Sequence, residues 1–115
     1  MAFNEILANR IRERLIGLPN VKEKVMMGGL VFMVNDKMCI GIIKDEMMCR
    51  IDRSFHETAI EMRGCRTMDF TKRPMIGYVL IDKTGMKTNA EFDYWINLCL
   101  DFNKYAKASK KKRKT

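Results

Sequence analysis

The sequence lacks any long apolar stretch. Its apolar runs, such as residues 30–34 and 39–43, are far shorter than the ~20 consecutive apolar residues that a membrane-spanning helix needs. Charged residues, among them Glu5 and Arg10, occupy the N-terminal region where a secretory signal peptide has its apolar segment. We therefore expect a soluble, cytoplasmic protein that does not enter a membrane.

Histidine and closely spaced cysteines, the usual ligands of a structural metal ion, are also scarce. The chain has one histidine, His56, and none of its four cysteines stands in a Cys-x-x-Cys pair. A zinc site usually takes four such ligands, two of them close in sequence. Cys39, Cys49 and Cys99 lie in apolar patterns, where a free cysteine packs as a small hydrophobe. We expect buried, reduced thiols and neither a metal nor a cofactor.

Acidic residues are absent from the last nine positions, 107–115, which hold six lysines and arginines. Removing these six from the 22 basic residues leaves 16 against 14 acidic ones, so residues 1–106 are nearly neutral and form the predicted single domain. The tail is predicted to be disordered. Two roles remain open for it: a solubilising end, or weak binding of nucleic acid or of an acidic partner. The residues concerned are Lys110, Lys111, Lys112, Arg113 and Lys114.

Between residues 21 and 51, apolar blocks of four to six residues alternate with residues that favour turns. Breaks of two residues at Gly28-Gly29, Asn35-Asp36 and Asp45-Glu46 join only antiparallel neighbours. The pattern predicts a meander in which residues 21–27, with their lysines, form an edge strand. The two glycines are interpreted as a bulge or corner that lets another backbone approach closely. Residues 76–81 are predicted to form a further strand.

Three helices are predicted around these strands. Apolar residues recur every four positions over residues 3–16, and the arginines at 10, 12 and 14 are interpreted as a solvated face rather than a phosphate-binding ridge. Ser54 and Glu57 have the spacing of a capping box, which predicts a short helix to about residue 62 with His56 in its first turn. Thr88 and Glu91 repeat that spacing and open a helix that runs to about residue 106.

The predicted fold is therefore α+β. An antiparallel meander sheet of about five strands packs against N-terminal, middle and C-terminal helices.

Residues 65–75 show neither helical nor strand periodicity, and Pro74 argues against a central strand. Long irregular connections are often functional, so we take Asp69, Lys72 and Arg73 as a candidate interaction loop. The alternative is a plain connector that crosses the sheet. Catalysis would need a concave pocket with convergent polar groups here, and His56 has no evident nucleophile or orienting acid, so we expect no enzyme.

Two long blocks of sequence carry a family resemblance. The first covers residues 17–21 and 26–38 with Gly41 following, and the second covers residues 68–79. In these blocks the chain resembles the N-terminal domain of the TfoX/Sxy family of bacterial competence regulators. It departs from the family pattern at Met27, where phenylalanine is common, and at Asp36 and Lys72, where glycine is usual.

The resemblance implies an antiparallel sheet flanked by helices at its start, between its later strands and at its end. It implies a stand-alone N-terminal domain, because 115 residues leave no room for the second domain of full-length competence regulators. The expected function is a non-catalytic regulatory or protein-interaction module with a protein partner, and self-association stays open. The alternative is a nucleic-acid-associated accessory protein that uses the basic tail.

Overall fold

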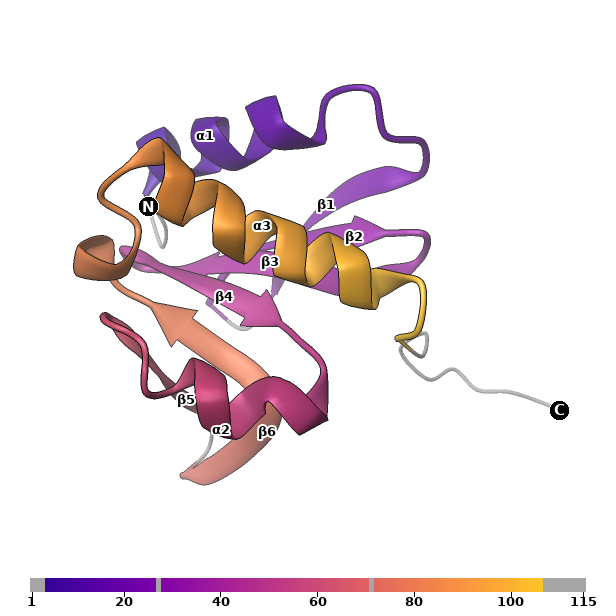
Figure 1. Ribbon diagram of the computed structural model, residues 1–115. Coiled ribbons are helices and arrows are strands. Elements are labelled where there is room, and N and C mark those ends of the chain that lie inside the picture. Colours follow the sequence, from indigo (N-terminus) through magenta and orange to yellow (C-terminus); the bar gives the residue numbers. More distant parts are fainter. Residues whose placement is uncertain (1–3, 27, 71, 107–115) are drawn as a thin grey trace, which may run out of the picture.

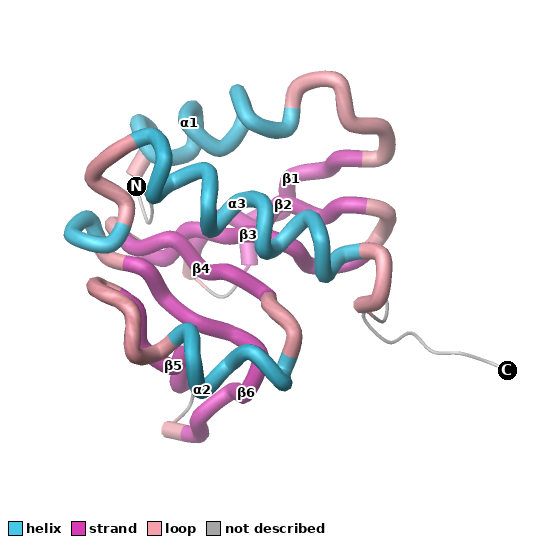
Figure 2. Tube along the Cα trace, in the orientation of Figure 1, coloured by secondary structure: helices cyan, strands magenta, loops and turns pink. Residues whose placement is uncertain are grey.

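The computed structural model of the chain describes residues 4–26, 28–70 and 72–106. These residues form one six-stranded antiparallel sheet with three α-helices on one of its faces (Figures 1 and 2). In chain order the elements are α1 (Glu5–Leu15), β1 (Val21–Met26), β2 (Gly29–Val34), β3 (Lys37–Ile43), β4 (Glu46–Arg50), α2 (His56–Ala59), β5 (Cys65–Phe70), β6 (Arg73–Ile81) and α3 (Asn89–Asn103). Two 3₁₀ turns, Arg53–Phe55 and Lys83–Gly85, precede α2 and α3. The α+β prediction is confirmed, with one strand more than expected.

The order of the strands across the sheet is β1-β2-β3-β4-β6-β5. The first four strands form the predicted meander, and β1 is an edge strand as expected. Asn35 and Asp36 both have positive φ angles, 55° and 65°, which two-residue hairpins of the primed type require. The next turn consists of Lys44 and Asp45, one residue earlier than predicted.

Gly29 allows the close backbone approach that its sequence context predicts. A Cβ atom at this position would lie 1.9 Å from the carbonyl oxygen of Ile42 on the neighbouring strand. No side chain larger than hydrogen fits there, so β2 and β3 come together only because residue 29 is glycine.

The prediction of an irregular loop at residues 65–75 is wrong, because residues 65–70 form β5 and residues 73–75 begin β6. Strand periodicity is hidden by a register shift between Thr67 and Met68. Pro74 is tolerated because β6 pairs with β4 only from Tyr78 to Ile81. At Pro74 the strand has β5 as its single neighbour, so no ladder hydrogen bond toward β4 is lost.

The capping box predicted at Ser54 and Glu57 is also wrong. The Asp52 carboxylate accepts hydrogen bonds from the backbone N–H and the hydroxyl of Ser54, both at 2.8 Å. Asp52 therefore caps the 3₁₀ turn Arg53–Phe55, and α2 follows without a side-chain cap and ends at Ala59. The carboxylate of an aspartate two residues before a backbone N–H competes well for that donor. The capped segment therefore begins after Asp52 and not after Ser54.

The second predicted capping box is confirmed at the start of α3. The Glu91 N–H donates to the Thr88 hydroxyl and the Thr88 N–H donates to the Glu91 carboxylate, both at 3.0 Å. Helix α3 ends at Asn103, three residues earlier than predicted. The side-chain amide of Asn103 donates to the carbonyl of Val34 at 3.1 Å, and this bond attaches the end of α3 to the β2–β3 turn.

The core lies between the helices and the sheet. Apolar side chains of α1 and α3, including the buried Trp95, pack on the side chains of β2 to β6 that point toward the helices. The opposite face of the sheet carries a smaller apolar cluster around Met48, Met68 and Leu80. In the part of the chain that the structure covers, no helix has the length and apolarity needed to cross a membrane.

Candidate functional site

The predicted interaction residues Asp69, Lys72 and Arg73 lie together at the end of the β5–β6 hairpin. Asp69 pairs with Pro74 in the ladder, and all three side chains are exposed. Lys72 has a positive φ of 65°. None of the three lines the hollow described below. Their role in binding stays a prediction, as does that of Lys110–Lys114, which lie outside the described residues.

His56 is buried, with only 2% of its surface exposed, and both of its ring nitrogens are occupied. The Gly77 N–H donates to Nδ1 at 2.9 Å, so Nδ1 carries no proton. The proton of the neutral ring therefore sits on Nε2, which donates to the Thr67 hydroxyl at 2.9 Å. Through these two contacts His56 joins α2 to β5 and β6.

All four cysteines are buried. Burial raises the pKa of Cys65 to about 12 and raises the pKa of Cys39 and Cys99 far above the range of an exposed thiol. A hydrogen bond with Cys49 adds to the effect at Cys99. The thiols of Cys39, Cys65 and Cys99 therefore stay protonated at neutral pH and are poor nucleophiles. Among the residues described, no three histidine, cysteine or acidic side chains form a group that could hold a metal ion.

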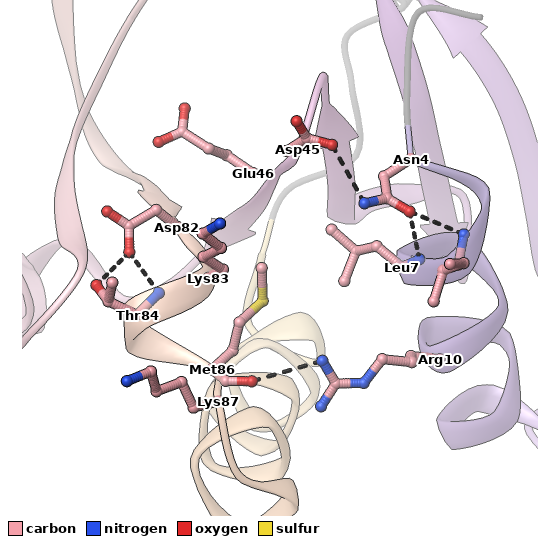
Figure 3. Close-up of a pocket in the computed structure, with 11 residues that line it drawn as sticks. Asn4, Leu7, Arg10, Asp45, Glu46, Asp82, Lys83, Thr84, Met86 and Lys87 are labelled. Atoms are coloured by element: carbon pink, nitrogen blue, oxygen red, sulfur yellow. Dashed lines mark hydrogen bonds between the residues drawn. The ribbon is translucent and has the colours of Figure 1, made fainter.

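An open hollow of about 840 Å³ lies where the start of α1, the β3–β4 turn and the β6–α3 connection meet (Figure 3). It brings together three segments that are far apart in the sequence. The lining residues are Asn4, Ile6, Leu7, Arg10, Asp45, Glu46, Asp82, Lys83, Thr84, Met86 and Lys87.

Asn4 fixes one wall of the hollow. Its side-chain oxygen accepts hydrogen bonds from the N–H groups of Ile6 and Leu7, at 2.9 and 3.1 Å, and so caps α1. Its amide nitrogen donates to the Asp45 carboxylate at 3.2 Å, and its backbone N–H donates to the Lys44 carbonyl at 2.9 Å. The first turn of α1 is thereby attached to the β3–β4 turn.

Asp82 and Trp95 fix the opposite wall. The Asp82 carboxylate accepts hydrogen bonds from the hydroxyl and the backbone N–H of Thr84, and these bonds lower the pKa of Asp82. The indole N–H of Trp95 donates to the Gly85 carbonyl at 3.1 Å. A Cβ atom on Gly85 would lie 2.5 Å from the Arg63 carbonyl oxygen, so the turn packs closely on the preceding loop.

The acidic side chains that line the hollow are all engaged within the protein. Asp45 accepts from Asn4, Glu46 forms an ion pair with Arg66, and Asp82 accepts from Thr84. The lining therefore presents carboxylates whose charge is already compensated or hydrogen-bonded.

The basic side chains that line the hollow form no ion pair with a carboxylate among the described residues. Arg10 lies over the Phe92 ring, 4.0 Å from its centroid, and its Nη1 donates to the Met86 carbonyl at a long 3.5 Å. Lys83 and Lys87 are exposed. None of the ion pairs found in the described part of the chain involves these three side chains. The lining nevertheless holds three acidic side chains beside these three basic ones, so its formal charge is balanced.

The other two arginines of α1 have structural partners. Arg12 makes a two-pronged ion pair with Glu23 of β1, at 2.8 Å for each contact. Arg14 pairs with Asp93 of α3 and lies beside the Phe92 ring. All three arginines of α1 are therefore half-buried and contact other elements, so the interpretation of a solvated face is wrong.

The described residues form a small α+β domain with an open hollow at one end of its sheet. The family model of the TfoX N-terminal domain matches residues 13–103, and the chain belongs to this family. Comparison with curated proteins and with solved structures gives no significant match.

Proposed function

We propose that this domain is a non-catalytic protein-interaction module of a regulatory system, as its resemblance to the N-terminal domain of competence regulators implies. The main support is the use of its chemically versatile side chains inside the fold. The single histidine bonds Gly77 and Thr67, and all four cysteines are buried thiols. Buried free thiols also suit a reducing compartment, which supports a cytoplasmic location.

The open hollow supports an interaction role. Its lining combines apolar side chains, among them Ile6, with polar ones, and it is open rather than enclosed. Protein contact surfaces commonly combine apolar and polar groups in this way.

Affinity capture from a lysate of the source organism tests the proposal. The immobilised full chain should retain a defined protein at a salt concentration that screens exposed charges. A variant without residues 107–115 should retain the same protein, because the contact is made by the folded domain. If every captured protein is lost as salt rises, or is lost with the tail, the proposal is wrong.

A second function, nucleic-acid association through the tail, is favoured by the six basic residues and no acid at positions 107–115. Binding of a DNA or RNA duplex should then fall steeply with rising salt and disappear when the tail is deleted. Lys22→Gln with Lys24→Gln is the control, since it removes two charges from β1 and leaves the tail intact. Binding that does not depend on salt contradicts this alternative.

A further inference from the structure

We infer that a groove beside the end of α3 binds this chain's own basic residues 107–115, which lie outside the described residues. The groove has a volume of about 180 Å³ and lies between the end of α3 and the segment that joins β4 to α2 (Figure 1). Its lining comes from residues 51–55 on one side and from residues 98–105 on the other. The contact is independent of the protein partner proposed above.

The two charged side chains that line the groove are both acidic. Asp52 and Asp101 are exposed, and neither forms an ion pair among the described residues. Ser54 donates two hydrogen bonds to Asp52, but its donors are neutral groups and leave the negative charge in place. No basic side chain of the described residues lines the groove. The lining therefore attracts a cationic occupant.

The basic side chains next to this lining in the sequence are directed toward other groups. Arg50 donates to the carbonyl of Met38 at 3.3 Å, and Arg53 donates to the carbonyl of Ile76 at 3.4 Å. Lys104 is exposed at the end of α3. None of these three cations lies among the lining residues, so they do not fill the groove.

Three aromatic side chains, those of Phe55, Phe102 and Tyr105, line the same groove. The face of an aromatic ring attracts the cationic head of lysine or arginine, and the apolar stem of such a side chain packs on apolar surface. Tyr105 has 75% of its surface exposed, so it gains contacts when a chain covers the groove. Carboxylates beside aromatic rings are a combination that suits lysine and arginine side chains.

The chain's own tail is well placed to supply these cations. Residues 107–115 hold six basic residues and no acidic one, and they begin two residues after Tyr105, which is itself part of the lining. Residues 107–109 span at most ~10 Å, so the basic run at 110–114 starts close to the groove. A short connection within one chain gives an effective concentration on the order of millimolar, so individually weak contacts populate the docked state. The groove and a nucleic acid would then compete for the same cations.

NMR spectra of two full-length proteins test the inference: the wild type, and a variant in which the basic residues 110–114 are replaced by glutamine. At low salt the amide signals of Asp52, Phe55 and Leu98, called the groove signals below, should differ between the two proteins. Residues 52 and 55 are distant from the tail in sequence, so only a contact through space moves their signals. The differences should vanish at a salt concentration that screens exposed charges.

Two charge-matched double variants locate the contact. Asp52→Asn with Asp101→Asn removes both acids of the groove, and asparagine at position 52 can still accept the hydrogen bonds from Ser54. In this background the tail replacement should move the groove signals at least about threefold less than in the wild type. Glu5→Gln with Asp69→Asn changes the net charge equally, at exposed positions at the start of α1 and near the tip of the β5–β6 hairpin. It should leave the effect of the tail replacement within about twofold.

Tyr105→Leu tests the aromatic contact, because it keeps an apolar side chain at an exposed position and removes the ring. It should reduce the effect of the tail replacement on the groove signals. Signal changes confined to residues 103–106, next to the tail in sequence, overturn the inference. Equal losses in both double variants also overturn it, in favour of general charge attraction. Changes of the groove signals that grow with protein concentration overturn it as well, because the groove would then hold the tail of a second copy.

Discussion

The imidazole of His56 makes two hydrogen bonds that hold α2 against the β5–β6 hairpin, and suitable replacements of His56 remove one of them at a time. In asparagine, the side-chain oxygen reaches the position of Nδ1 and can still accept from the Gly77 N–H. In glutamine, the side-chain amide reaches the position of Nε2 and can still contact the Thr67 hydroxyl. Alanine removes both contacts and leaves a cavity.

The two hydrogen bonds differ in how much their loss lowers the free energy of unfolding. The Gly77 N–H is buried, so its loss of an acceptor costs about 1–3 kcal/mol. The Thr67 hydroxyl is half-buried and can turn toward water, so its loss costs about 0.5–1 kcal/mol. We expect the free energy of unfolding to fall by about 1 kcal/mol in His56→Asn and by about 2 kcal/mol in His56→Gln. His56→Ala adds a cavity and should cost about 3–5 kcal/mol.

Urea unfolding followed by the fluorescence of Trp95, the single tryptophan and a buried one, measures these differences. The dependence on urea should keep the same slope, since the fold is unchanged. Thr67→Val is the control: it should cost less in the His56→Asn background than in the wild type, because its partner is already lost. A glutamine variant as stable as the asparagine variant refutes the assignment of Nδ1 as the acceptor.

Three further predictions concern single sites. Asp36→Gly should raise the free energy of unfolding by about 0.5 kcal/mol, because the φ of 65° at Asp36 strains an L-residue; a lower urea midpoint contradicts this. The pKa of Asp82 is lowered by the Thr84 hydrogen bonds, so its stabilisation is present above the ordinary value of 3.8 and is lost as pH falls through the lowered value. The stability difference between the wild type and Asp82→Asn, followed by urea unfolding against pH, should therefore shrink on acidification and not grow. Cys65, whose pKa burial raises to about 12, should react with iodoacetamide far more slowly in the folded than in the unfolded chain, as mass spectrometry of the labelled peptides will show.

Two parts of the fold, the β2–β3 hairpin and the start of α3, could be predicted from local signals. Asn35 and Asp36 tolerate the positive φ angles of a tight hairpin, and the Thr88–Glu91 capping box marks the start of α3. These signals work because turn and cap chemistry is decided by residues within a few positions of one another.

The errors arose where a partner distant in sequence decides the outcome. Proline is unfavourable in a strand that pairs with a neighbour on both sides. At Pro74, β6 pairs only with β5, because β4 ends before it reaches this position. The error at Ser54 has a local cause instead, because Asp52, two residues earlier, takes the backbone donor that the expected capping box would use. His56 is drawn into the interior by Gly77, which lies 21 residues away.

The hollow escaped sequence-based prediction for the same reason. Its walls come from residues 4–10, 45–46 and 82–87, and none of these segments carries a recognisable binding motif. Arg10 was considered only as part of the α1 surface. The one available signal was the exposed Ile6 beside the apolar stripe of α1, which becomes informative only when the β6–α3 connection is placed next to it.

Affinity capture from a lysate is the measurement that most directly tests the central claim, a protein-interaction role of the folded domain. We predict that the full chain and a variant without residues 107–115 retain the same protein at a salt concentration that screens exposed charges. Loss of every captured protein as salt rises, or on deletion of residues 107–115, would contradict a contact made by the folded domain.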